Sequence, residues 1–142
     1  MSTPFVDMTG DPAVRGFLHV PVRANGSAVV LTHGAGADCQ SRLLVEMSDA
    51  LAASGFTVLR CDLPFRQLRP HGPPPPGSAA RDQNGLRRAI EVMKGKTQGR
   101  VFVGGHSYGG RQATLLVSAE PELVDGTTSS VRKPAANCRP AS

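Results

Sequence analysis

Apolar residues in this 142-residue chain gather in short continuous runs that are separated by longer, mixed segments. The runs at 28–32, 56–61 and 100–103 are rich in Val, Leu and Phe, and they are typical of strands buried on both faces. A fourth, shorter run predicts a strand over residues 17–22. The pattern therefore predicts about four strands, most of them in the interior of a sheet.

The segments between these runs carry apolar residues at three- and four-residue spacing, which predicts amphipathic helices. We expect helices from Ser41 to Gly55, from Asn84 to Lys94 and from Gly109 to Ala119. Strands that alternate with helices need crossover connections, and these produce parallel strand pairs. The chain is therefore predicted to be an α/β protein, with a mostly parallel sheet flanked by helices.

Two segments depart from this alternation. Residues 64–80 contain four consecutive prolines at 73–76 and predict a long, stiff loop that caps a site, with a docking segment for a proline-binding module as the alternative. Residues 127–142 contain one valine and no leucine, isoleucine or phenylalanine. Because such a segment buries too little apolar surface to fold, we expect a folded region over 1–126 and a disordered basic tail over 127–142.

The charge and the cysteine content indicate which binding partners and which cellular compartment to expect. The formal net charge is +5, but three of the sixteen basic residues and none of the eleven acidic residues lie in the tail. The other arginines are dispersed and Tyr108 is the only tyrosine, so we expect no nucleic-acid partner. Three cysteines without metal-like spacing predict neither a disulfide framework nor a metal site, and no motif requires a cofactor. Without a leader or a run of ~20 apolar residues, the chain is predicted to be cytoplasmic and not to contact a membrane.

Residues 105–109 read Gly-His-Ser-Tyr-Gly and match the pattern G-x-S-x-G. They follow a predicted buried strand and precede a predicted helix, the context in which this pattern forms a tight elbow. The flanking glycines leave room for strand and helix, and the turn lifts Ser107 above the sheet at the positive end of the helix. We therefore expect Ser107 to be a nucleophile.

A second glycine loop, His33-Gly34-Ala35-Gly36, follows the predicted strand at 28–32. A loop in this place supplies the second half of an oxyanion hole when the nucleophile lies on such an elbow. We expect the backbone N–H groups of Ala35 and Tyr108 to face the substrate oxygen, each contributing about 3–4 kcal/mol of transition-state stabilisation. His33 is expected to shape this loop and to contact substrate.

Three further polar residues near these loops have either a functional or a structural interpretation: Asp62, Arg66 and His106. Asp62 and Arg66 follow the strand at 56–61, at the edge where open α/β sheets bind ligands. We expect them either to contact substrate or to anchor a loop through a salt bridge. His106 adjoins Ser107 in sequence, where neighbouring side chains diverge, and is expected to pack rather than to act as the base.

Phosphate binding is the alternative interpretation of the glycines at 104–110. Gly105 and Gly110 have the spacing of a phosphate-binding P-loop, but Arg111 and Gln112 stand where lysine and Ser/Thr are required. Neither glycine loop reads G-x-G-x-x-G, which argues against a dinucleotide site.

Three segments, at residues 29–36, 55–66 and 104–113, together carry a family resemblance that extends over roughly residues 15–126. They resemble the dienelactone-hydrolase-like branch of the α/β-hydrolases, and within it the group described as KANL/Tex-type α/β-hydrolase-like proteins. The resemblance implies a partial α/β-hydrolase fold and a serine hydrolase acting on small esters or related acyl compounds. It also implies that some members are scaffold subunits rather than enzymes.

In this fold the catalytic triad runs in chain order Ser, then Asp or Glu, then His. His106 is the last histidine of the chain, and the later carboxylates come too early to match the acid: Glu120, Glu122 and Asp125. We therefore expect little or no esterase turnover, and we interpret the chain as truncated or frameshifted after residue 126. A non-catalytic hydrolase-like binding module is the alternative. Without a further strand, the Ser107 strand would be an exposed sheet edge that invites self-association.

Overall fold

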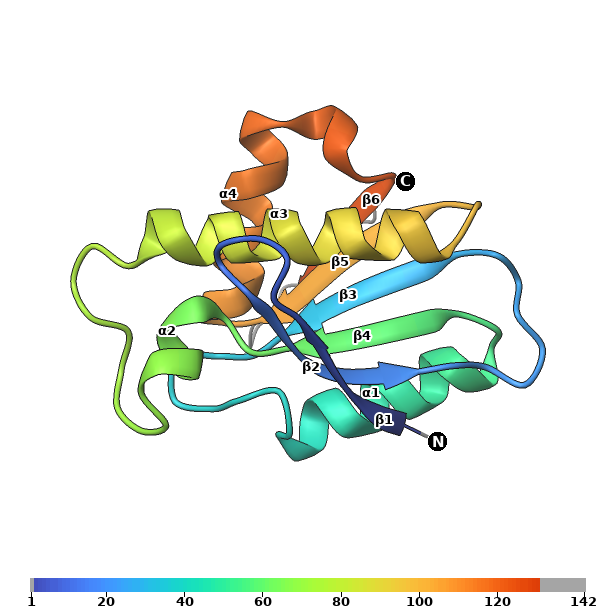
Figure 1. Cartoon of the computed structure of the whole chain (residues 1–142), viewed down its shortest axis with the longest axis horizontal. Coiled ribbons are helices and arrows are strands. Elements are labelled where there is room, and N and C mark those ends of the chain that lie inside the picture. Colours follow the sequence, from blue (N-terminus) through green and yellow to red (C-terminus); the bar gives the residue numbers. More distant parts are fainter. Residues whose placement is uncertain (1, 131–142) are drawn as a thin grey trace.

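A computed structural model describes residues 2–130 and contains a six-stranded sheet in the order β1-β2-β4-β3-β5-β6 (Figure 1). Strands β3 to β6 are parallel to one another, whereas β1 and β2 run antiparallel to their neighbours at one edge. The strands span β1 Ser2–Asp7, β2 Val14–His19, β3 Ala28–Thr32, β4 Thr57–Cys61, β5 Val101–His106 and β6 Gly126–Ser130.

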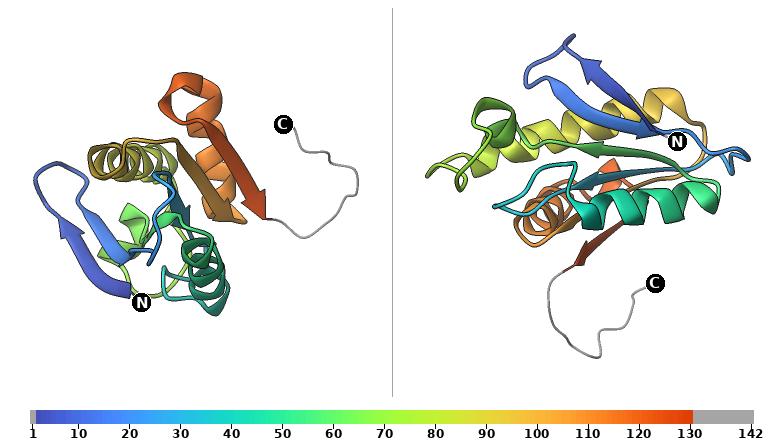
Figure 2. Two further views of the ribbon diagram at one scale, coloured as in Figure 1. Left: turned by 90° about the vertical axis from the view of Figure 1, so that its right-hand side faces the viewer. Right: turned by 90° about the horizontal axis from the view of Figure 1, so that it is seen from below.

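Helices cover both faces of the sheet, with α1 on one face and α3 and α4 on the other (Figure 2). The helices span α1 Arg42–Ala53, α2 Pro64–Leu68, α3 Ala79–Lys96 and α4 Tyr108–Ala119, with a short 3₁₀ helix at Pro121–Leu123. Ser41 caps α1, because its hydroxyl accepts a hydrogen bond from the N–H of Leu44 at 3.3 Å. None of the helices in residues 2–130 is long and apolar enough to cross a membrane.

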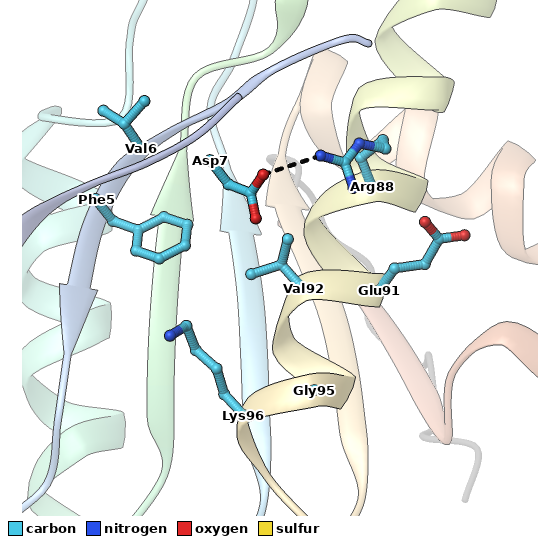
Figure 3. Close-up of a pocket in the computed structure, with 8 residues that line it drawn as sticks. All are labelled: Phe5, Val6, Asp7, Arg88, Glu91, Val92, Gly95 and Lys96. Atoms are coloured by element: carbon cyan, nitrogen blue, oxygen red, sulfur yellow. Dashed lines mark hydrogen bonds and ion pairs between the residues drawn. The ribbon is translucent and has the colours of Figure 1, made fainter. Parts of the chain in front are cut away.

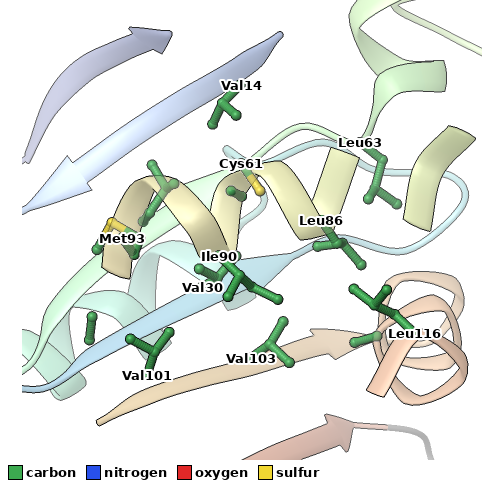
Figure 4. Close-up of a cluster of buried hydrophobic side chains, with 14 of the residues drawn as sticks. Val14, Val30, Cys61, Leu63, Leu86, Ile90, Met93, Val101, Val103 and Leu116 are labelled. Atoms are coloured by element: carbon green, nitrogen blue, oxygen red, sulfur yellow. The ribbon is translucent and has the colours of Figure 1, made fainter. Parts of the chain in front are cut away.

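The two-residue period of the strands divides the core into two layers. Val30, Val101 and Val103 point toward α3 and α4, as Figure 4 shows, and pack with Ile90 and Met93. The alternate strand residues face the other way and pack against Leu44 of α1: Val29, Leu31 and Val58. The central strands are therefore buried on both faces, as their continuous apolar runs predict.

The α/β architecture with a mostly parallel sheet is confirmed, but the sheet has six strands where about four were expected. Strand β1 was missed because it carries Pro4 and no fully buried side chain, a combination that an edge strand tolerates. Strand β2 lies three residues earlier than the predicted 17–22, and Val20 and Val22 are exposed beyond its end.

The segment at 64–80 is not entirely a loop. Its first residues form helix α2, and α3 begins at Ala79, five residues before the predicted start. Pro64 suits the first position of α2, because that position needs no hydrogen-bonding N–H. The four prolines at 73–76 lie in the connection between the two helices.

The C-terminal boundary also differs from the expectation. Residues 127–130, which were expected in the tail, continue β6, and β6 pairs in parallel with β5 from Phe102↔Gly126 to His106↔Ser130. The prediction that the Ser107 strand is an exposed edge is therefore wrong. A run of Thr and Ser can join a sheet without the apolar residues on which the expectation relied. Residues 131–142 of the predicted tail lie outside the described residues.

Candidate active site

Three loops meet at the carboxyl ends of neighbouring parallel strands. Thr32, the last residue of β3, is in register with Cys61 at the end of β4 and with Gly105 near the end of β5. The residues that follow these ends are the predicted site residues: His33, Asp62 and Ser107. The sheet therefore gathers, at one edge, segments that are far apart in the sequence.

Ser107 has the backbone of a strained elbow. Its φ of 53° and ψ of −114° make it the one non-glycine residue with positive φ in the described part of the chain, and its side chain is exposed. Helix α4 begins at the next residue. A Cβ added to Gly105 would lie 2.6 Å from backbone atoms of Gly109 and Gly110, so the turn requires glycine there.

The two glycine loops are in contact. A Cβ built on Gly34 would lie 3.4 Å from the His106 ring and 3.6 Å from Ser107 Cβ. His106 therefore packs beside Gly34, and its Nδ1 is buried without a hydrogen-bond partner among residues 2–130. This contact places the backbone of the His33–Ala37 loop next to the predicted nucleophile.

The buried His33 ring fixes this loop through two hydrogen bonds. The Leu63 N–H donates to His33 Nε2 at 3.0 Å, so the ring proton lies on Nδ1, which donates to the Gly34 carbonyl at 2.8 Å. In a trans peptide the C=O and the following N–H point in opposite directions. His33 thus turns the Ala35 N–H away from its own ring, which supports the expected role of Ala35 as an oxyanion donor.

Burial of two histidines predicts a pH dependence of stability. Burial is the main cause that lowers the pKa of His33, and burial followed by the charge of Arg60 lowers the pKa of His19. Both rings therefore bind fewer protons in the folded chain than in the unfolded chain, where the pKa of histidine is about 6.5. We expect the free energy of unfolding to fall as the pH drops through about 6.5.

Urea unfolding at a neutral and at a mildly acidic pH tests this expectation. Few other groups titrate in that interval, so the histidines dominate the change. The fall in the urea midpoint should be smaller in a His33→Asn variant than in the wild type. An equal fall in both proteins would show that His33 does not contribute.

Asp82 is a site residue that the sequence analysis missed. Its carboxylate is fully buried and accepts hydrogen bonds from the Tyr108 hydroxyl at 2.6 Å, the Phe65 N–H at 3.0 Å and the Ser78 hydroxyl at 3.1 Å. Burial, with a smaller contribution from Asp82, raises the pKa of Tyr108 to about 12. Asp82, which lies on α3, thus connects the residue after Ser107 to helix α2.

A signal for Asp82 was present in the sequence. It lies four residues before Leu86, on the stripe of α3 that also carries Ala89, Ile90 and Met93 into the core. An acidic residue on the buried stripe of a helix needs hydrogen-bond donors from other elements. This acid therefore pointed to a polar contact inside the fold.

The three predicted substrate contacts differ in exposure. The side chain of Asp62 is 26 % exposed and accepts a hydrogen bond from the Cys39 N–H at 2.8 Å, so its contact with substrate stays a prediction. His33 is fully buried, and both its ring nitrogens are occupied. Arg66 is buried, donates to backbone carbonyls and forms no ion pair within residues 2–130, so the expected salt bridge is not found.

A separate pocket of about 440 Å³ lies between β1 and α3 (Figure 3). Arg88 donates to Asp7 across it at 3.2 Å, and Lys96 lies over the Phe5 ring. None of its lining residues belongs to the loops around Ser107.

Across residues 2–130, no three His, Cys, Asp or Glu side chains are grouped so that they could hold a metal ion.

Solved structures share this fold. Dienelactone hydrolase from Anabaena variabilis ATCC 29413 superposes with a TM-score of 0.74 at 23% identity, covering 91% of this chain and 62% of that one. XC6422 from Xanthomonas campestris, described as an α/β serine hydrolase without a lid, gives 0.73 at 16% identity, with 90% and 60% covered. Est1E from Butyrivibrio proteoclasticus gives 0.71 at 15% identity, with 87% and 48% covered. The chain thus spans less than two thirds of each of these structures.

Sequence comparison identifies the family. A comparison with curated proteins gave no match. The family model described as "Alpha/beta hydrolase domain" matches residues 25–130, which include both glycine loops and the Ser107 elbow. The strand order, the elbow and this match agree, and the chain belongs to the α/β hydrolase domain family.

Proposed function

We propose that the chain carries the nucleophile and the oxyanion hole of a serine hydrolase for small esters or related acyl compounds. Ser107 is the nucleophile, and the N–H groups of Ala35 and Tyr108 are the oxyanion donors. The observation that carries this proposal is the elbow itself: Ser107 is exposed at positive φ, and the Gly34 backbone lies against it. The Tyr108 N–H supports it further, because the first N–H of a helix has no partner within the helix.

The chemistry follows from this arrangement. Ser107 Oγ attacks the ester carbonyl carbon while its proton passes to a base, and the carbonyl oxygen takes up negative charge between the two N–H donors. The alcohol then leaves with a proton, and water releases the acid from the acyl-serine. A serine without a base is a weak nucleophile, and this chain has no histidine after Ser107. We therefore propose that residues 1–142 alone turn esters over weakly.

Chemical rescue tests the proposal. We expect imidazole, an external base, to accelerate the acetylation of the chain by p-nitrophenyl acetate. Intact mass should show the addition of one acetyl group, and peptide mapping should locate it on Ser107. The Ser107→Ala variant should lose this acetylation, whereas Ser118→Ala, which removes an exposed serine on the same helix, should retain it.

Two results would contradict the proposal. Equal acetylation of wild type and Ser107→Ala would remove Ser107 from the chemistry. Absence of acetylation at any imidazole concentration would favour a non-catalytic hydrolase-like module. Rapid turnover without imidazole would instead contradict only the proposed weakness of the isolated chain.

A further inference from the structure

The Arg66 side chain is a buried cation whose hydrogen-bond partners are backbone carbonyls. It is 5 % exposed, and four of its five N–H groups are used. Its Nε donates to the Ala37 carbonyl at 2.8 Å, and Nη2 donates to the Ala35 and Gly72 carbonyls at 2.7 Å and 2.9 Å. Nη1 donates to the Arg69 carbonyl at 2.9 Å. Arg66 therefore joins the loop beside Ser107 to the connection that follows α2.

The bonds from Arg66 and the bond from His33 together fix the backbone of the His33–Ala37 loop. His33 holds the Gly34 carbonyl, and Arg66 holds the carbonyls of Ala35 and Ala37. With these carbonyls turned toward the protein, the Ala35 N–H is left facing away from the His33 ring. Gly36 itself is not packed, because a Cβ added there would meet no atom within 4 Å.

The choice of arginine is informative. A guanidinium stays charged at every relevant pH, and burying it is costly unless its donors are used. Here its donors meet carbonyl oxygens, and its carbon lies 4.7 Å from the centre of the Phe65 ring. An apolar side chain would fill the same space without that cost. The geometry therefore indicates that the directed N–H groups of Arg66 are what the site requires.

We propose that Arg66 is a positioning residue for the oxyanion hole, which it serves by fixing the backbone around Ala35. This inference rests on the proposed function of Ser107. The neighbouring residue Phe65 donates its N–H to Asp82, and Asp82 holds the Tyr108 hydroxyl. The short helix α2 is thus connected to both donor residues, to the Ala35 carbonyl through the Arg66 side chain and to the Tyr108 hydroxyl through the Phe65 backbone and Asp82.

Hydrogen exchange tests the structural step. Arg66→Met keeps a long unbranched side chain but removes every donor. In this variant the hydrogen-bonded amides of residues 37–40 and of Arg69 should exchange roughly tenfold faster or more, while those of β3 and β5 stay protected. Arg69→Met is the matched control, because it removes a nearby exposed positive charge but keeps the backbone carbonyl that Arg66 uses. Unchanged exchange at residues 37–40 in Arg66→Met would overturn the proposal.

Kinetics test the catalytic step. In imidazole-rescued acetylation, Arg66→Met should lower the rate at saturating ester by roughly 10- to 100-fold, since small displacements of catalytic groups have effects of this size. The half-saturating ester concentration should change by less than about twofold, because no contact with the ground-state ester is lost. Arg66→Lys, with one charge and fewer donors, should fall between Met and Arg, and it carries the test if Arg66→Met does not fold.

The outcomes separate the two proposals. If the wild type is not acetylated, the proposed function fails, and hydrogen exchange still decides whether Arg66 holds the loop. If acetylation occurs but Arg66→Met raises only the half-saturating concentration, Arg66 contacts substrate and is not a positioning residue. An equal loss of rate in Arg69→Met would assign the effect to local charge and would also overturn the proposal.

Discussion

Replacing Gly109 with alanine is expected to lower the free energy of unfolding by roughly 3 kcal/mol, at the upper end of overpacking effects. A Cβ at this position would overlap the carbonyl oxygen of His33 and lie 2.7 Å from Thr32 Cγ2. The oxygen belongs to backbone at the end of β3, so it cannot move aside as a flexible side chain could. The strain would be relieved only by moving α4 away from the sheet, which would also displace Ser107.

Gly95→Ala is the matched control for Gly109→Ala. Both glycines lie in helices, but a Cβ at Gly95 meets no atom within 4 Å. Alanine is better than glycine in an open helical position by roughly 1 kcal/mol, so this variant should be more stable than the wild type. Urea unfolding of the wild type, Gly109→Ala and Gly95→Ala measures these differences in the free energy of unfolding. Equal effects of the two substitutions would show that α4 is not packed tightly against β3.

Replacing Asp82 with alanine is expected to lower the free energy of unfolding by roughly 3 kcal/mol or more, because each buried polar group left without a partner costs about 1–3 kcal/mol. The substitution removes the acceptor of the Phe65 N–H, the Ser78 hydroxyl and the Tyr108 hydroxyl, and leaves Tyr108 only the Ser78 hydroxyl at 3.4 Å. Tyr108→Phe removes only one of these contacts and should cost about 1 kcal/mol. The double variant should be more stable than the sum of the two losses predicts, because the two residues share one hydrogen bond.

Tyr108 also reports on Asp82 spectroscopically, because it is the only tyrosine in the chain. Ultraviolet titration of the phenol should give a pKa of about 12 in the wild type. In Asp82→Ala the pKa should fall toward the ordinary value of about 10, but only in part, since burial is the larger cause. An unchanged pKa in Asp82→Ala would mean that the hydroxyl does not donate to this carboxylate.

The sequence was most informative where structure is determined by neighbouring residues. The elbow could be predicted because the crowding around Gly105 arises within five residues of sequence, and the interior strands because burial on both faces leaves a continuous apolar run. The edge strands were harder to predict. Strands β1 and β6 gain stability from pairing with a neighbour, and their composition carries little trace of it.

The supporting contacts of the site could not be predicted, because they connect residues that are distant in sequence. Arg66 was expected to contact substrate or a carboxylate, but its partners include carbonyls about 30 residues earlier in the chain. Backbone carbonyls are present at every position, so no sequence pattern marks the ones that a guanidinium will use. The buried stripe of α3 marks Asp82 as an acid that needs donors, but not which donors, since these come from α2, from α4 and from Ser78 just before α3.

The pairing of β5 with β3 also has a consequence for the order of folding. Ala28 is in register with Val101, so the two glycine loops meet only when segments about 70 residues apart in sequence have come together. Parallel pairs of this kind form slowly, because the entropy of closing the connection is lost before the contact forms. During synthesis, β3 is completed long before β5 emerges, so the edge of β3 that pairs with β5 stays unpaired until then. The elbow is therefore expected to be among the last parts of the molecule to form.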